Sequence, residues 1–250
     1  MESKLVTKKY LNSFKPHLSE GSESVRFYND DYFLKIINSK ILKNGRRDVI
    51  LKLEELKHNN TVTPEFLLHD RTGIIGYATQ NYLDYDYIDI LFNDESITLE
   101  DRKQLMIKLA QIIEYLKKKD FAYYDIHEGN ILYKNGDIKL IDLDGGVFKD
   151  KQNCGITYEG ACRKSNWKLA LFTLSFLYKL EWDTFYNLLN INNKNSYNAF
   201  MKTIPTKLKP FYEYVINRDF SILDGIQDYI DSIDQTTFDN SNEVLQLKLK

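Results

Sequence analysis

The chain has 250 residues, of which 43% are hydrophobic and 28% charged, and its formal net charge is −2. This composition excludes a wholly disordered chain, a collagen-like repeat and a strongly basic protein, so we expect no nucleic-acid partner. Cys154 and Cys162, the only two cysteines, match neither a disulfide framework nor a zinc motif, and no apolar run approaches the roughly 18 residues that span a bilayer, so we expect a cytoplasmic protein without membrane insertion.

The first part of the chain has the pattern of a small β-sheet with one helix. Residues 25–37 form two β-rich runs around a short polar turn, which predicts a hairpin. Residues 39–57 place apolar side chains at mostly helical spacing, with an interruption or a late start at Gly45. Two further β-like runs flank another polar turn, at residues 64–68 and 74–83.

After Leu83 the pattern becomes mainly helical. Thr98 is a candidate N-cap, with acidic residues in the first turn and apolar residues on one face of the helix that follows. Residues 129–148 return to short strands around Asn135-Gly136, the strongest short hairpin signal. A hairpin is therefore expected among helices.

The last third of the chain is expected to pack as helices. Residues 167–178 are apolar nearly all round, which predicts a helix in the centre of the core. Amphipathic segments continue through residues 183–233, and the polar residues 235–250 are expected to fray.

One loop and the hairpin after it carry the residues for phosphoryl transfer. This chemistry needs a carboxylate to orient and deprotonate the acceptor hydroxyl and hard oxygen ligands to hold magnesium on the phosphates. Asp125 and Asn130 share one loop as Asp-x-x-x-x-Asn, and the hairpin returns Asp142 towards them. Each residue alone could cap a turn, begin a hairpin or end a strand. Their joint spacing favours a phosphotransferase site.

These segments resemble the protein-kinase motifs His-Arg-Asp-x-x-x-x-Asn and Asp-Phe-Gly. The resemblance covers most of the chain and implies ATP and Mg²⁺ as cofactors. It makes Asp125 the catalytic base, and Asn130 and Asp142 the metal ligands. Leu143 and Asp144 replace Phe-Gly, as in bacterial kinase-like proteins, so Asp144 is either a further metal-site carboxylate or a surface turn residue.

The same resemblance implies a phosphate-covering loop and a strand lysine in the first part of the chain. Residues 18–24 stand in place of the glycine-rich loop, and Glu23 at its tip is an awkward neighbour for ATP that could point away. Lys35 is expected to hold the α and β phosphates, with an edge-strand lysine as the alternative. The loop residues expected to contact the nucleotide are Ser19, Gly21, Ser22 and Ser24.

A helix glutamate and a hinge complete the implied nucleotide site. Glu54 is the expected ion-pair partner of Lys35. Glu55 is the alternative, because the sequence does not fix the helix phase to one residue. A solvated surface carboxylate is the other interpretation of either glutamate. Residues 81–83 resemble the hinge that binds adenine through backbone groups. The expected cofactor contacts there are Asn81 and Leu83, with Gln80 as gatekeeper.

Several residues depart from the protein-kinase pattern. Tyr123 and Tyr124 replace His and Arg, so the arginine that receives an activation-loop phosphate is missing. His127 stands where many serine/threonine kinases have Lys; small-molecule kinases of the aminoglycoside and choline type often have His there, and a structural histidine beneath the loop is the alternative. No Ala-Pro-Glu motif is recognisable between Val147 and Trp167.

We therefore predict an α+β, two-lobed protein-kinase-like fold in one domain. The expected function is a serine/threonine protein kinase, with a protein substrate favoured over a small-molecule acceptor. The alternatives are a small-molecule kinase of the aminoglycoside or choline type and a nucleotide-binding pseudokinase scaffold. The expected parts are an N-lobe of about 1–80, a hinge of about 81–83, a C-lobe of about 84–234 and a polar tail of 235–250.

Overall fold

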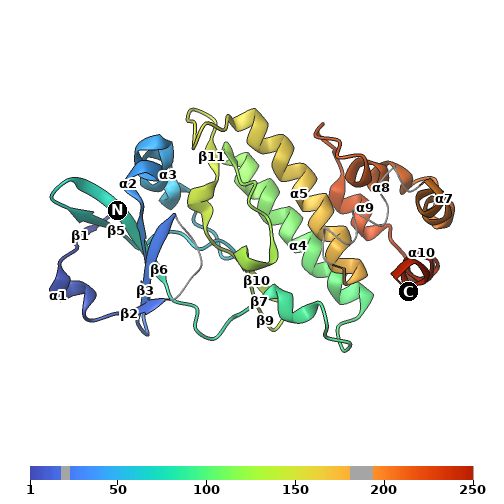
Figure 1. The fold of residues 1–250 in the computed structure, drawn as a ribbon, viewed down its shortest axis with the longest axis horizontal. Helices are drawn as coiled ribbons and strands as arrows, with labels where there is room; N and C mark the ends of the chain where they lie inside the picture. Colours follow the sequence, from blue (N-terminus) through green and yellow to red (C-terminus); the bar gives the residue numbers. More distant parts are fainter. Residues whose placement is uncertain (18–22, 181–193, 250) are drawn as a thin grey trace.

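The computed structural model describes residues 1–17, 23–180 and 194–249. It has an α+β fold in which a β-sheet forms one lobe and helices dominate the other, as the sequence predicts (Figure 1). No helix within these ranges is long and apolar enough to cross a membrane.

The N-terminal lobe is built on one six-stranded sheet in the order β1-β5-β6-β4-β3-β2. The predicted hairpins are confirmed as the pairs β3–β4 and β5–β6, whereas β1 adds a parallel edge strand that the sequence did not indicate. The strands are β1 Ser3–Leu5, β2 Lys15–His17, β3 Ser24–Tyr28, β4 Tyr32–Ile37, β5 Phe66–Asp70 and β6 Gly73–Gln80.

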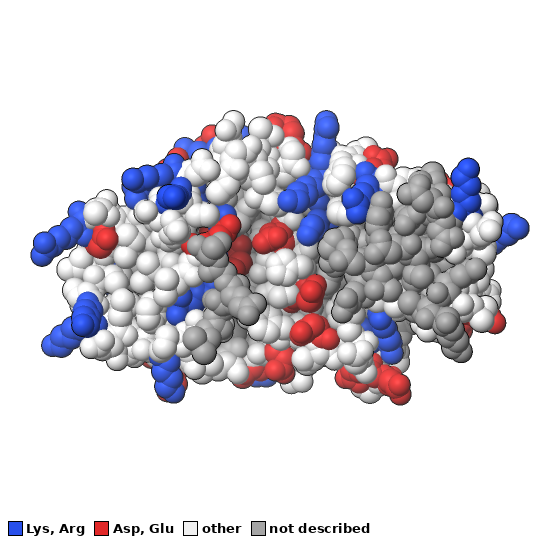
Figure 2. Space-filling view, viewed as in Figure 1, with Lys and Arg blue, Asp and Glu red and all other residues white. Residues whose placement is uncertain are grey.

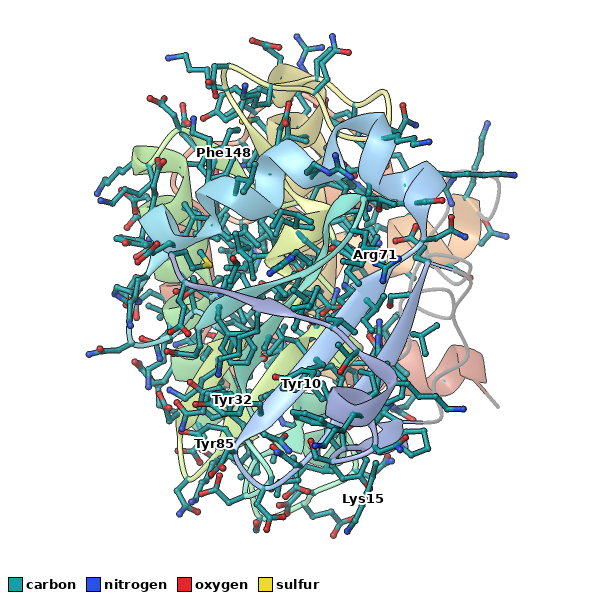
Figure 3. The ribbon with its side chains drawn as sticks, turned by 90° about the vertical axis from the view of Figure 1, so that its left-hand side faces the viewer. Tyr10, Lys15, Tyr32, Arg71, Tyr85 and Phe148 are labelled. Carbon is teal, nitrogen blue, oxygen red and sulfur yellow. The ribbon has the colours of Figure 1, made fainter. Side chains whose placement is uncertain are left out.

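Separate elements cover the two faces of this sheet. The short helix α1 (Lys8–Leu11) lies on the outer face, where Tyr10 and Tyr32 approach each other over a small apolar cluster (Figure 3). The helical segment between β4 and β5 covers the inner face. It consists of α2 Ser39–Ile41, the π-helical turn η1 Leu42–Arg46, α3 Arg47–Lys52 and the 3₁₀ turn η2 Leu53–Leu56.

Gly45 interrupts this helical segment, as expected. Its φ is +97°, a conformation that favours glycine, and a Cβ there would lie 2.2 Å from the backbone oxygen of Gln152. The bend therefore lets the helix approach the segment that follows the Asp142 region.

Two long helices form the centre of the C-terminal lobe (Figure 1). Helix α4 (Leu99–Lys118) begins with a capping box in which Thr98 and Asp101 exchange hydrogen bonds, which confirms the predicted N-cap. Helix α5 (Tyr158–Tyr178) contains the apolar run, but it starts nine residues earlier than the run does, at the Thr157 cap.

Short strands and turns lie along the chain between β6 and α4 and between α4 and α5. The predicted hairpin at Asn135-Gly136 is confirmed as β9–β10, and β7 extends it to three strands. These strands and turns are β7 Asp86–Tyr87, η3 Ile88–Leu91, β8 Phe121–Ala122, η4 Glu128–Asn130, β9 Ile131–Lys134, β10 Asp137–Leu140, η5 Leu143–Gly145 and β11 Val147–Phe148.

The expectation of a frayed tail is wrong. Residues Gln235–Leu249 form helix α10, in which Ser241 and Leu245 are fully buried. The Ser241 hydroxyl lies 2.6 Å from the hydroxyl of Tyr178 on α5. This helix completes the far end of the lobe with α7 Lys194–Thr203, α8 Lys209–Ile216 and α9 Ile226–Asp231 (Figure 1).

Candidate active site

A cavity of about 330 Å³ lies between the two lobes. This volume is at the small end of the range for small-molecule sites. Acidic side chains run across the middle of this face of the protein, where the lobes meet (Figure 2). Most of the cavity residues come from β4, β6 and the residues after β6, and the C-lobe contributes Leu132, Ile141 and Asp142.

The structure brings Asp125 and Asn130 together. The Asn130 amide donates hydrogen bonds to the backbone oxygen of Asp125 at 2.9 Å and to its carboxylate at 3.2 Å. Asn130 is 5% exposed, whereas the Asp125 side chain is half exposed. The loop therefore fixes the Asp125 carboxylate and leaves it open to an incoming group.

Tyr123 replaces the motif histidine with another hydrogen-bonding group. Its buried hydroxyl donates to the backbone oxygens of Asp125, at 3.0 Å, and Ile141, at 3.2 Å. The backbone nitrogen of Ile141 donates to the oxygen of Asn130 at 3.0 Å. These bonds join the loop to the end of β10, directly before Asp142.

Asp142 faces the N-terminal lobe from a left-handed backbone conformation, with φ of +56°. One of its carboxylate oxygens lies 3.2 Å from the Lys35 ammonium and 3.3 Å from the Arg26 guanidinium. A positive φ is uncommon outside glycine, and such strain is often found at functional sites. Asp142 therefore meets two cations of the opposite lobe.

The donor set around Asp142 fits a magnesium ion carried on phosphates. Both contacts of the Asn130 amide nitrogen go to Asp125, which leaves its side-chain oxygen as the atom for a cation. No cluster of three or more acidic, histidine or cysteine ligands occurs in the described part of the chain. Magnesium commonly uses one or two carboxylates and takes its remaining ligands from phosphate and water.

Lys35 is paired with Asp144, which excludes both roles that the sequence suggested for Asp144. The Lys35 ammonium lies 2.8 Å from the carboxylate of Asp144, which is 0% exposed. The same carboxylate accepts hydrogen bonds from Arg46 at 2.8 Å and from the Tyr77 hydroxyl at 2.6 Å. Asp144 is therefore neither a surface turn residue nor free to bind a metal.

The charges of this buried group stabilise one another. Burial alone would raise the pKa of Asp144, but Lys35 and Arg46 outweigh burial and hold that pKa well below its usual range. Burial alone would lower the pKa of Lys35, but Asp144 and Asp142 raise it above its ordinary value. Both groups therefore carry their charges around neutral pH.

The expected ion pair of Lys35 with Glu54 is not formed. Glu54 is exposed and lies 3.5 Å from the N-terminal amine of Met1, and Glu55 is also exposed. The 3₁₀ turn at the end of the helical segment carries both glutamates to the surface. Arg46, the last residue of η1 directly before α3, is the residue of this segment that reaches the Asp144 carboxylate.

The nucleotide-loop prediction can be followed only in part. Ser19, Gly21 and Ser22 lie outside the described residues. Ser24 begins β3, and its hydroxyl accepts a hydrogen bond from Arg26 at 3.3 Å. Glu23 lies 3.5 Å from Arg46, so its charge has a partner on the helical segment.

The predicted hinge residues line the cavity, but one backbone group differs from the prediction. The backbone nitrogen of Asn81 donates to Asp31 at 2.9 Å, so it is not free for adenine. Gln80 also lines the cavity but is exposed, whereas its neighbours Tyr77 and Thr79 on β6 are buried there. Leu83 lines the cavity and is 62% exposed.

His127 stabilises the loop after Asp125. Its Nδ1 accepts a hydrogen bond from the backbone of Gly129 at 3.1 Å and so caps the turn η4. Its Nε2 lies 3.8 Å from the Asp125 carboxylate. These contacts agree with the structural alternative for this histidine.

The segment after Asp144 is held by Asn153, which is 0% exposed. The Asn153 amide donates to the backbone oxygens of Asp144 and Gly146, both at 2.8 Å, and its oxygen accepts from Arg46 at 3.2 Å. The backbone of Cys154 adds a hydrogen bond to Asn44 at 2.8 Å. The helical segment and the segment after Asp144 are therefore fixed to each other.

Sequence reasoning missed four residues of this site. For one of them a signal exists, because Arg26 interrupts an apolar strand in the same way as Lys35 does. Arg46 and Tyr77 have no local signal, since their partner Asp144 is 98 and 67 residues away. Asn153 bonds to backbone oxygens only 9 and 7 residues away, but nothing in the sequence marks it. The four residues are Arg26, Arg46, Tyr77 and Asn153.

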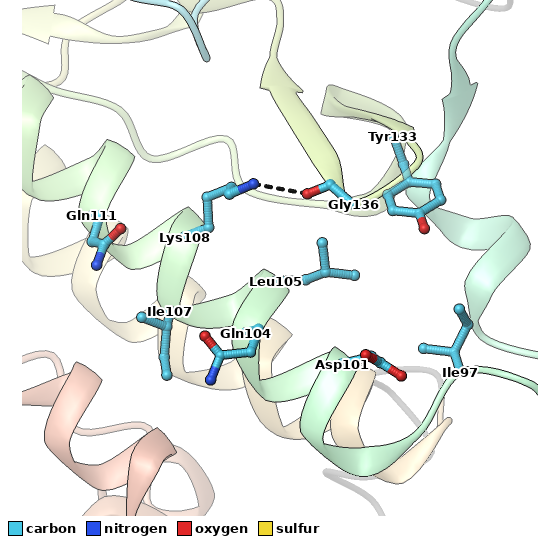
Figure 4. A pocket seen from close by; sticks show the side chains of 9 residues that line it. All are labelled: Ile97, Asp101, Gln104, Leu105, Ile107, Lys108, Gln111, Tyr133 and Gly136. Carbon is cyan, nitrogen blue, oxygen red and sulfur yellow. Dashed lines mark hydrogen bonds between the residues drawn. The ribbon is translucent and has the colours of Figure 1, made fainter.

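A second cavity, of about 540 Å³, lies between α4 and the turn of the β9–β10 hairpin (Figure 4). Lys108 crosses one end and donates a hydrogen bond to the backbone oxygen of Gly136 at 2.8 Å. Although this cavity is larger, none of the predicted site residues lines it. The interlobe cavity, in contrast, is lined by several of them, including Lys35 and Asp142.

Comparison with known proteins finds protein kinases. The chain is 28% identical over 121 residues to "Probable cyclin-dependent kinase 10" of Dictyostelium discoideum, which covers 44% of this chain and 33% of that protein. It is 28% identical over 147 residues to "Dual specificity protein kinase zak2" of the same organism, covering 54% and 19%. It is 32% identical over 71 residues to "Probable serine/threonine-protein kinase FPV212" of fowlpox virus, covering 28% and 23%. No family model matches. The chain thus spans a third or less of the curated relatives it matches.

Proposed function

We propose that the chain, which is similar to protein kinases, is an ATP-dependent phosphotransferase of the protein-kinase-like superfamily that acts on a serine or threonine hydroxyl of a protein. One observation carries this proposal. The loop holds Asp125 and Asn130 within hydrogen-bond distance of each other and is bonded to the residue before Asp142. We infer that a base and two oxygen ligands come together next to Asp142, which lines the interlobe cavity.

The residues divide the work of the reaction between them. Asp125 orients the acceptor hydroxyl and accepts its proton, because its carboxylate is fixed at one side and open at the other. Lys35 neutralises charge on the nucleotide phosphates. Magnesium, held by Asp142 and Asn130, supplies further charge neutralisation on those phosphates. Catalysis is then mainly positioning and electrostatic stabilisation.

The region around α5 favours a protein acceptor. Residues 143–157 connect the Asp142 region to α5 by one 3₁₀ turn, one short strand and a bonded loop, without an inserted helix. A connection over residues 143–157 without an added helix suits a polypeptide acceptor better than a small molecule that must be enclosed. This observation favours the protein kinase over the small-molecule kinase.

The proposed base is tested with Asp125→Asn. We expect phosphoryl transfer to fall by about 10²–10⁴-fold, because the amide cannot accept the proton, while ATP affinity stays near that of the unmutated protein. Calorimetric titration with ATP and Mg²⁺ and single-turnover transfer from γ-labelled ATP measure the two quantities. Glu128→Gln is the matched control, since Glu128 is exposed on the same loop.

The outcomes separate the proposals. Label on generic protein substrates supports the protein kinase, and label on small hydroxylated acceptors supports the small-molecule kinase. Nucleotide binding without any transfer by the unmutated protein identifies a pseudokinase scaffold. Unchanged transfer by Asp125→Asn would remove Asp125 from the catalytic role.

A further inference from the structure

Arg26 and Lys35 form a row of cations that faces Asp142. They are directly opposite each other on β3 and β4, and Tyr77 on β6 continues the row. Cross-strand neighbours of this kind lie on the same face of a sheet. Both cations reach the same carboxylate oxygen of Asp142, at 3.3 Å and 3.2 Å. The carboxylate expected to bind magnesium is therefore held by two protein cations.

The two cations differ in their other partners. Lys35 has a second carboxylate, because Asp144 lies 2.8 Å away. Arg26 has only Asp142 within ion-pair distance among the described residues, and its other contact is the neutral Ser24 hydroxyl at 3.3 Å. The Arg26 side chain is also more exposed, 27% against 6% for Lys35. Arg26 therefore loses less interaction energy than Lys35 would when it moves away from Asp142.

We propose that Arg26 is a ligand of the nucleotide phosphates and that it exchanges Asp142 for them when the nucleotide binds. This inference rests on the proposed function, because it needs a nucleotide in the interlobe cavity. A guanidinium binds phosphate through two parallel hydrogen bonds, which are stronger than its single contact to the Asp142 carboxylate, which is 24% exposed. Once Arg26 has moved to phosphate, the Asp142 carboxylate is released for a metal ion.

The exchange also accounts for the unusual composition of the nucleotide loop. Only Gly21 remains of the glycines of that motif, so the loop offers fewer positions of close backbone approach. A cation that enters from the strand directly after this loop supplies attraction for the phosphates by another route. The exchange also makes phosphate and metal binding cooperative. Phosphate that binds Arg26 and a metal ion that binds Asp142 both require the Arg26–Asp142 pair to separate, so each favours binding of the other.

Arg26→Met should change the affinities for phosphate and metal in opposite directions. We expect ADP without metal to bind at least about ten-fold more weakly, because a charge-assisted hydrogen bond is lost. Adenosine should bind as it does to the unmutated protein. Mn²⁺ alone, as the magnesium probe, should bind about two- to five-fold more tightly, since a competitor for Asp142 is gone.

Calorimetry in EDTA measures ADP and adenosine, and electron paramagnetic resonance measures Mn²⁺. Asp142→Asn identifies the part of the Mn²⁺ signal that depends on Asp142. Lys40→Met, which removes an exposed cation of α2, is the matched control and should change none of the three affinities. Arg26→Lys should recover part of the ADP affinity, because it restores the charge without the planar fork.

Each other result overturns the inference. Equal losses for ADP and adenosine would mean that Arg26 only shapes the cavity, and unchanged ADP affinity would mean that it does not touch phosphate. Weaker Mn²⁺ binding would mean that it does not compete for Asp142. If the unmutated protein binds neither adenosine nor ADP, the proposed function fails together with this inference, whereas normal binding by the unmutated protein confines a failure to Arg26.

Discussion

At the scale of single residues, Asp144 is the buried carboxylate that pairs with Lys35. The expected glutamates lie at the surface, and the helical segment contributes the cation Arg46 instead. The helical segment therefore presents a positive charge to the site, where the sequence suggested a negative one. Asp144 lies only two residues after the expected metal ligand Asp142, so both carboxylates that contact Lys35 come from one Asp-Leu-Asp sequence.

This arrangement predicts which substitutions affect turnover. Lys35→Met should lower phosphoryl transfer by about 10²–10³-fold, because a positioned cation on the phosphates is lost. Glu54→Gln should leave transfer unchanged, since the ion pair that the structure gives for the Glu54 side chain is with the N-terminal amine and not with Lys35. Single-turnover assays on both variants check the pair. A large loss in Glu54→Gln would restore the ion pair that the sequence suggested.

Asp144→Asn should destabilise the protein by about 3–5 kcal/mol, because it leaves two buried cations without their shared carboxylate. The pKa of Asp144 is lowered in the folded protein, so its contribution is complete above its unfolded pKa and is lost as the pH falls through the folded pKa. The difference in unfolding free energy from the unmutated protein should therefore stay constant between about pH 5 and 9 and shrink below about pH 4.

Urea unfolding of both proteins across this pH range measures the difference. A difference that changes steeply between pH 5 and 9 would contradict the assignment of Asp144 as an ionised group.

At the scale of elements, the helical segment over residues 39–56 is shaped by its contact with the segment after Asp144. Gly45 bends it, Asn44 accepts a hydrogen bond from Cys154, and Arg46 reaches Asn153 and Asp144. Lys52 adds a contact with Asp150 at 3.1 Å. The segment is therefore positioned by backbone and side-chain contacts along most of its length.

Gly45→Ala tests this close approach. The substitution adds a Cβ that would lie 2.2 Å from the Gln152 oxygen, at a φ of +97°. We expect a loss of about 1–2 kcal/mol from the left-handed backbone and about 1–3 kcal/mol more from the clash. Gly155→Ala has a similar φ of +79° with open space around it, and should lose only the first amount. Equal losses in thermal unfolding would show that the contact is unimportant.

The C-terminal helix α10 gives another prediction at this scale. Leu245→Ala should cost about 2–5 kcal/mol, because Leu245 is 0% exposed in the core. Leu247→Ala, in the same helix, should be nearly neutral because Leu247 is 64% exposed. Denaturant unfolding distinguishes the two. Similar small effects would mean that residues 235–249 contribute no core.

Elements with strong local signals could be predicted from the sequence. Asn135-Gly136, the Thr98 cap and the break at Gly45 each specify a backbone geometry by their own chemistry. Helix α10 could not be predicted, because its buried face includes the polar Ser241, whose partner Tyr178 is 63 residues away. The Asp144 network could not be predicted for the same reason, since sequence spacing does not show which carboxylate reaches a distant lysine.

At the scale of the whole molecule, the buried charges join the two lobes. Lys35, Arg46 and Tyr77 come from the N-terminal lobe and meet on Asp144 of the C-terminal lobe. Buried ion pairs add little net stability, but removing one partner is costly. The network therefore fixes the relative position of the strand lysine and the Asp142 region more than it stabilises either lobe.

Arg46→Met should loosen this junction without unfolding the lobes. Arg46 is 6% exposed and binds both Asp144 and Asn153, so its loss frees the helical segment from the segment after Asp144. Amides in residues 39–56 and 145–156 should exchange with deuterium at least about ten-fold faster, equivalent to about 1.4 kcal/mol. Amides in α4 should keep their protection, because that helix lies in the core of the C-terminal lobe.

Arg47→Met is the matched control for this exchange experiment. It removes the same side chain at the next position of the helical segment, and no ion pair of Arg47 occurs among the described residues. Faster exchange in both variants alike would mean that the effect comes from the helix itself. Faster exchange confined to residues 39–56 would mean that Arg46 does not hold the segment after Asp144, and that Asn153 alone fixes it to the site.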